Sequence, residues 1–109
     1  MLLAADAVTT ETLETLPKGV RDHLRTVAIL LENHPCQDDV ASGIEPDTLG
    51  YFDEDDTGLV RIRLWLDNIL DYSGGDQSVF REEVRTTLLH EIGHVLGWDE
   101  DDVEERGLG

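Results

Sequence analysis

The sequence predicts an α+β domain in which a small twisted sheet is covered on one face by helices. Three observations support this prediction: helical spacing of apolar residues near the N-terminus, three short β-rich segments between residues 26 and 66, and a long amphipathic stretch over residues 76–97. Strands and helices segregated in this way are typical of α+β folds. A chain of 109 residues can bury one modest core, so we expect a single domain over residues 1–109.

The N-terminal helical region is expected to begin late. Residues 1–9 have little periodicity and predict a frayed end, whereas Thr10 is a candidate helix cap. Pro17 should divide the following stretch into two short helices or one kinked helix. The apolar residues at helical spacing are Leu13, Leu16, Val20 and Leu24.

Three strands are expected next. Residues 26–31 are apolar and β-rich, which predicts a buried strand, and residues 33–48 have the turn chemistry of a long loop. Residues 49–52 predict a short strand, followed by an acidic hairpin turn over 53–58. Residues 59–66 alternate between an apolar face and a face with Arg61, Arg63 and Trp65, which predicts a half-buried strand.

The long amphipathic stretch predicts one helix. At about 100° per residue, one side is apolar, and the other carries Glu83, Thr87, His90 and His94. The residues of the apolar side are Val84, Leu88, Ile92 and Val95. Asp76 or Ser78 is placed to cap the beginning of the helix, and Gly97 is placed to end it in a left-handed conformation.

The polar side of this helix carries the strongest chemical motif of the chain, His90-Glu91-Ile92-Gly93-His94, with the pattern HExxH. Histidines four residues apart on a helix can hold one zinc ion through their ring nitrogens. The intervening Glu91 can then reach a zinc-bound water and act as general base. The alternative is that the two histidines bind no metal and are only polar residues on a solvated helix face.

Gly97 suggests how a third ligand reaches the metal, because a left-handed turn there would bring a residue three positions later back towards the histidines. That residue is Glu100, with Asp99 and Asp101 beside it. Asp99 is also a candidate cap of a further short helix, in which Glu100 would only favour the helix dipole.

Residues 84–108 resemble the small single-domain zincin-like metallopeptidases, whose motif reads HExxHxxGxxD. The resemblance implies a minimal zincin fold, with the sheet packed against an N-terminal helix and the HExxH helix. It implies one Zn²⁺ per chain, bound by His90, His94 and Glu100, and hydrolysis of peptide bonds with Glu91 as base. Glu stands here in place of the usual Asp or His, and no methionine follows the motif, since Met1 is the only methionine.

Zincins often add an oxyanion donor, for which Tyr51, Tyr72 and His34 are candidates that the sequence does not separate. The main alternative function is a catalytically weak or inactive zincin-fold protein that binds metal or a protein partner. A third reading is a structural acidic protein in which the HExxH pattern is coincidental.

The charge limits the partners. Twenty-five acidic residues against eight basic ones give a net charge of −17, which disfavours nucleic acid and anionic membranes and favours basic peptides. General solubility or a salty host explains the same charge without any partner.

The single cysteine, Cys36, allows no intrachain disulfide, and no apolar run is long enough to span a membrane. We therefore expect a cytoplasmic protein.

Overall fold

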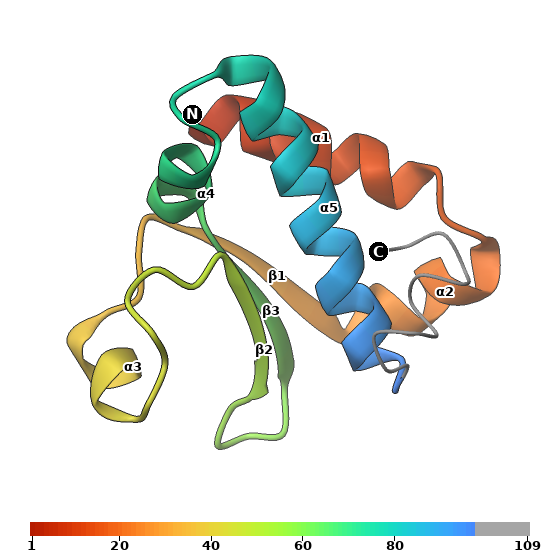
Figure 1. The fold of residues 1–109 in the computed structure, drawn as a ribbon. Coiled ribbons are helices and arrows are strands. Elements are labelled where there is room, and N and C mark those ends of the chain that lie inside the picture. Colours follow the sequence, from red (N-terminus) through yellow and green to blue (C-terminus); the bar gives the residue numbers. More distant parts are fainter. Residues whose placement is uncertain (98–109) are drawn as a thin grey trace.

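The structure is a computed structural model that describes residues 1–97. Five helices and three strands carry the fold of this part of the chain (Figure 1). In chain order the elements are α1 (Leu2–Glu14), α2 (Lys18–His23), the 3₁₀ turn η1 (Leu24–Thr26), β1 (Val27–Glu32), α3 (Gln37–Ala41), β2 (Gly50–Glu54), β3 (Val60–Trp65), α4 (Leu66–Tyr72) and α5 (Gln77–Val95). The predicted α+β class is confirmed.

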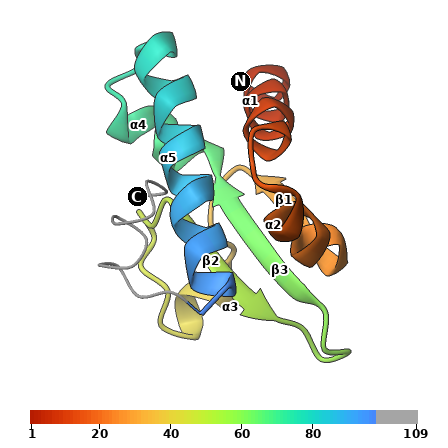
Figure 2. The ribbon, with the colours of Figure 1, turned by 90° about the vertical axis from the view of Figure 1, so that its right-hand side faces the viewer.

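The sheet has the strand order β1-β3-β2. β1 runs parallel to the central strand β3, and β2 runs antiparallel to it through the hairpin expected at residues 53–58. In this turn Gly58 N–H donates to the carbonyl of Asp55 at 3.0 Å. β2 is therefore an edge strand, and α5 crosses the sheet next to it (Figures 1 and 2).

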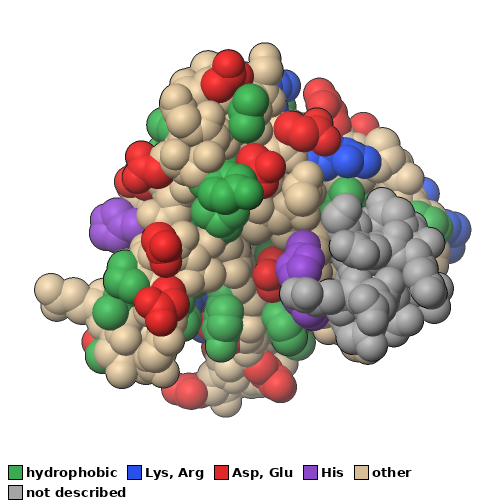
Figure 3. All heavy atoms as spheres, viewed as in Figure 1, with side chains coloured by type: hydrophobic (Ala, Val, Ile, Leu, Met, Phe, Trp, Pro, Cys, Tyr) green, Lys and Arg blue, Asp and Glu red, His purple; other side chains and the backbone are tan. Residues whose placement is uncertain are grey.

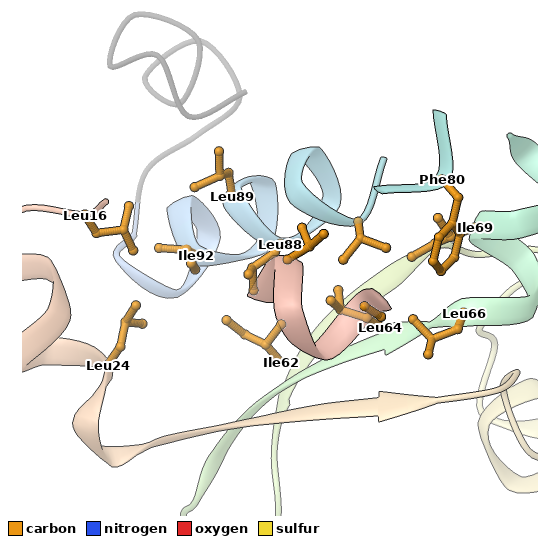
Figure 4. Packing of buried hydrophobic residues seen from close by; sticks show 13 residues of the cluster. Leu16, Leu24, Ile62, Leu64, Leu66, Ile69, Phe80, Leu88, Leu89 and Ile92 are labelled. Carbon is orange, nitrogen blue, oxygen red and sulfur yellow. The ribbon is translucent and has the colours of Figure 1, made fainter. Parts of the chain in front are cut away.

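The core lies between α5 and the sheet (Figure 4). Leu88 and Ile92 of α5 face Ile62 and Leu64 of β3, and all four side chains are fully buried. Burial of each such side chain contributes about 1.5–3 kcal/mol. The predicted apolar side of the long helix is thus the side that packs on the sheet.

Both ends of α5 agree with the sequence. The Asp76 side chain caps the helix by accepting a hydrogen bond from Val79 N–H at 3.0 Å. After the helix, Gly97 adopts a left-handed φ of 81°. The cap and the glycine together fix where the HExxH helix begins and ends.

The expected fraying of residues 1–9 is wrong, and Thr10 is not a helix cap, because α1 begins at Leu2. The helix buries Ala5, Val8, Thr9 and Thr12, which follow helical spacing. Small and polar residues give this stripe a weak hydrophobic signal, although it packs against α5. Pro17 does separate α1 from α2, as predicted.

The predicted half-burial of β3 is also wrong, because the face away from α5 is covered as well. Arg63 and Trp65 are 8% and 0% exposed. Arg63 donates two hydrogen bonds to Asp39, at 2.8 and 2.6 Å, and another to Glu32 at 2.9 Å. Trp65 Nε1 donates to the same Glu32 carboxylate at 3.0 Å.

Asp39 belongs to α3, a short helix inside the segment that was expected to be an irregular loop over 33–48. Its carboxylate also accepts a hydrogen bond from Cys36 N–H at 2.9 Å and so caps α3. Hydrogen bonding to Arg63 holds the pKa of Asp39 well below its usual range. One carboxylate therefore orders the segment and ties it to the sheet.

No helix among residues 1–97 is long and apolar enough to cross a membrane.

Candidate metal and catalytic site

The two histidines of the motif lie one helical turn apart near the C-terminal end of α5. Their Nε2 atoms are 2.9 Å apart, and the planes of the two rings are inclined by 81°. Both side chains are partly exposed. The two ring nitrogens therefore lie within hydrogen-bonding distance of each other on a partly exposed side of α5.

Glu91 lies between them in sequence and is 8% exposed. Burial raises the pKa of its carboxyl, and the neighbouring His94 partly offsets this effect. Desolvation disfavours the charged form of a carboxyl and makes its carboxylate a stronger base. A buried carboxylate beside two accessible imidazoles is the arrangement that the HExxH chemistry requires.

β2 forms the other side of the site. The Phe52 ring stacks on the His94 ring, with centroids 5.8 Å apart and planes 16° from parallel. Gly50 lies so close to α5 that a Cβ there would be 2.6 Å from Thr87 Cγ2. The glycine thus allows the edge strand to approach the helix that carries the histidines.

A pocket of about 250 Å³ opens between the beginning of β2 and α5. The residues that line it are Leu49, Gly50, Glu83, Thr86, Thr87, His90 and Glu91. Two residues of the HExxH motif, His90 and Glu91, therefore border a space large enough for one side chain. On the face shown in Figure 3, histidine and acidic side chains adjoin near the centre, and acidic side chains outnumber basic ones.

Comparison with known families agrees with this geometry. The profile of the zincin-like metallopeptidase family matches residues 24–109, from the η1 turn through the HExxH helix to the last residue. The chain belongs to the zincin-like metallopeptidase family. Among curated proteins, none matches this chain.

Zincins generally bind zinc, so the residues of this zincin can be tested against that ion. Two nitrogen ligands, each about 2.0–2.1 Å from a tetrahedral zinc ion, lie about 3.3 Å from each other. The Nε2 atoms of His90 and His94 are 2.9 Å apart, so a small rotation of either ring would give that separation. Imidazole nitrogen is also one of the ligand atoms that zinc prefers. His90 and His94 therefore fit a zinc site.

Within residues 1–97, no group of three His, Cys, Asp or Glu side chains is placed to hold a metal ion. His34, for example, does not join His90 and His94 in such a group. The expected ligand Glu100, with its alternatives Asp99 and Asp101, lies outside the described residues. The third ligand stays a prediction.

The candidate oxyanion donors lie apart from the pocket, since none of the three lines it. Tyr51 stacks on Trp65, with ring centroids 6.4 Å apart, on the sheet face away from α5. Tyr72 in α4 is 67% exposed, and His34 Nδ1 contacts the Pro35 carbonyl oxygen at 3.1 Å. None of the three candidates therefore contributes to the lining of the pocket that Glu91 borders.

Two residues of the site were not found by sequence reasoning. Gly50 was read only as part of a strand, although an isolated glycine in a strand often marks a close backbone approach. Phe52 gave no local signal beyond strand propensity. Its role depends on the register of β2 against β3, which pairs Phe52 with Ile62 and so directs it towards α5.

Proposed function

We propose that this zincin is a zinc-dependent metallopeptidase with one zinc ion, bound by His90, His94 and Glu100. The observation that supports this most strongly is the convergence of the two Nε2 atoms beside the buried Glu91 carboxylate. When bound, zinc polarises the scissile carbonyl and lowers the pKa of a water molecule to about 7. Glu91 accepts the proton of the attacking water and returns it to the leaving amine.

The substrate is a peptide or protein segment in extended conformation. β2 pairs with β3 along one edge only, and within residues 1–97 no other strand pairs with its second edge. An extended peptide can add to such an edge through main-chain hydrogen bonds. The net charge of −17 favours basic peptides over nucleic acid and anionic membranes, which we do not propose as partners.

The assignment of Glu100 as third ligand rests on its spacing after Gly97. Glu100→Ala should weaken zinc binding strongly with little effect on folding. Asp99→Ala should retain zinc and cost about 1 kcal/mol of stability through the loss of a helix cap. If the two variants exchange these effects, Asp99 is the ligand.

Glu91→Gln tests the enzymatic proposal. The variant should retain zinc, because Glu91 is not a ligand, and lose peptidase activity by at least about a hundredfold. Denatured proteins and basic peptides are the substrates to screen first, with zinc content measured on the same samples. Unchanged turnover in Glu91→Gln would remove Glu91 from the mechanism. Zinc binding without turnover on any peptide would favour the non-hydrolytic zincin instead.

A further inference from the structure

The pocket beside Glu91 continues along α5 towards Glu83. Glu83 lies seven residues before His90, which corresponds to about 10 Å along the helix axis. Both residues line the same pocket, together with Thr87 between them. The pocket thus leads from the catalytic motif at one end to a second carboxylate at the other.

The size of this pocket suits one side chain. Its volume of about 250 Å³ is below the range of about 300–1,000 Å³ that is usual for sites of drug-sized ligands. Leu49, Thr86 and Thr87 also line the pocket, and its lining is more apolar than polar. An occupant therefore needs an apolar stem and, at its far end, a group that suits Glu83.

Glu83 is available to such a group. Among residues 1–97 its carboxylate takes part in no ion pair and in no side-chain hydrogen bond, whereas the adjacent Glu82 lies 3.8 Å from Arg85. Lysine and arginine combine an apolar stem with a positively charged end. Their stems match the apolar part of the pocket lining, and their charge matches Glu83.

We propose that this pocket selects a lysine or arginine side chain next to the cleaved bond, and that Glu83 determines this preference. The inference rests on the proposed peptidase function, because only a peptide held at Glu91 places a neighbouring side chain here. It adds a position-specific requirement to the general attraction of an acidic protein for basic peptides.

Peptides that differ at a single position provide the test. Each carries one lysine, or one norleucine of similar shape without the charge, at successive positions on either side of a central bond. With the zinc-loaded full chain, kcat/KM should be about five- to tenfold higher for lysine than for norleucine at one position adjacent to the cleaved bond. Glu83→Gln should abolish this preference. Glu82→Gln removes an equal charge outside the pocket and should preserve it.

Charge reversal adds a second variant. Glu83→Lys should favour peptides with glutamate over lysine at the same position. A lysine preference that persists in Glu83→Gln, or that falls equally in Glu82→Gln, would overturn the assignment, because long-range charge would then explain it. Circular dichroism on each variant checks that the fold is retained.

Binding separates this inference from the proposed function. Fluorescence anisotropy with the same labelled peptides can be measured on zinc-loaded Glu91→Gln, with and without the Glu83 substitution. Cleavage without a lysine preference would refute the pocket assignment and leave the peptidase standing. A Glu83-dependent preference in binding, with no cleavage by the wild type, would support the pocket and refute catalysis. If the protein neither binds nor cleaves any of these peptides, both the pocket assignment and the proposed peptidase function are refuted.

Discussion

Gly50→Ala should destabilise the protein, because Gly50 allows β2 to approach α5, the helix that carries the HExxH motif. A Cβ at this position would be 2.6 Å from Thr87 Cγ2 and 3.2 Å from Leu64 Cδ2. Carbon atoms in good contact are about 3.5–4.0 Å apart, so the strand or the helix must move by about 1 Å. Thr87 is β-branched within a helix and has few rotamers with which to yield. Overpacking of this kind costs about 1–3 kcal/mol.

Urea unfolding measures this cost, and a double-mutant cycle assigns it to one contact. Thr87→Ser removes the methyl group that the new Cβ would meet and alone should cost about 1 kcal/mol. The double variant Gly50→Ala/Thr87→Ser should be more stable than the sum of the single effects by about 1 kcal/mol or more.

Gly19→Ala is the matched control, because a Cβ at Gly19 in α2 would meet no atom within 4 Å. This control should be neutral or slightly stabilising, since alanine favours helix. Wild-type stability in Gly50→Ala, or strictly additive effects in the cycle, would show that β2 does not approach α5 at Thr87 in this way.

Two further predictions concern contacts that the sequence did not reveal. Phe52→Leu should weaken zinc binding about 2- to 12-fold in competition titrations, because the His94 imidazole loses its stacked partner. Tyr51→Leu is the control: it alters the opposite face of the sheet and should leave zinc affinity unchanged. Asp39→Asn should lower the free energy of unfolding at pH 7 by about 1–2 kcal/mol, because it breaks the ion pair with Arg63. Asp38 is exposed, so the control Asp38→Asn should leave stability unchanged. Equal losses of stability in the two variants would contradict a specific pair between Asp39 and Arg63. Because hydrogen bonding to Arg63 lowers the pKa of Asp39 in the folded state, this difference should be full at neutral pH and shrink as the pH falls below about 4.

The long helix and its motif could be predicted because their signals are local. The apolar stripe of α5 repeats every three or four residues, and the Asp76 cap and Gly97 stop lie at its ends. The same periodicity places His90 and His94 on one side. Their convergence therefore follows from helix geometry alone.

The parts that sequence reasoning missed depend on distant contacts or weak patterns. α1 buries Ala5, Thr9 and Thr12, whose low hydrophobicity hides the helical stripe. The order in α3 and the burial of the second sheet face rest on Asp39 and Arg63, which are 24 residues apart. Such pairs carry no periodicity that a single sequence could reveal.

The site divides in the same way. The HExxH residues were found from the motif, whereas Phe52 enters the site only through the pairing of β2 with β3 and the close approach at Gly50. The pocket towards Glu83 arises from the same approach, although the sequence already placed Glu83 on the side of the histidines. The expected third ligand, Glu100, lies beyond the described residues and remains a prediction from spacing.

Metal content tests the central claim most directly. The protein should be purified without chelators or a histidine tag, and zinc should be measured by elemental analysis and calorimetry. We predict one zinc ion per wild-type chain, its loss in His94→Ala, and its retention in His23→Ala, a control that changes a histidine in α2. A wild-type protein that takes up no zinc, or equal zinc affinity in wild type and His94→Ala, would contradict the proposed metal centre.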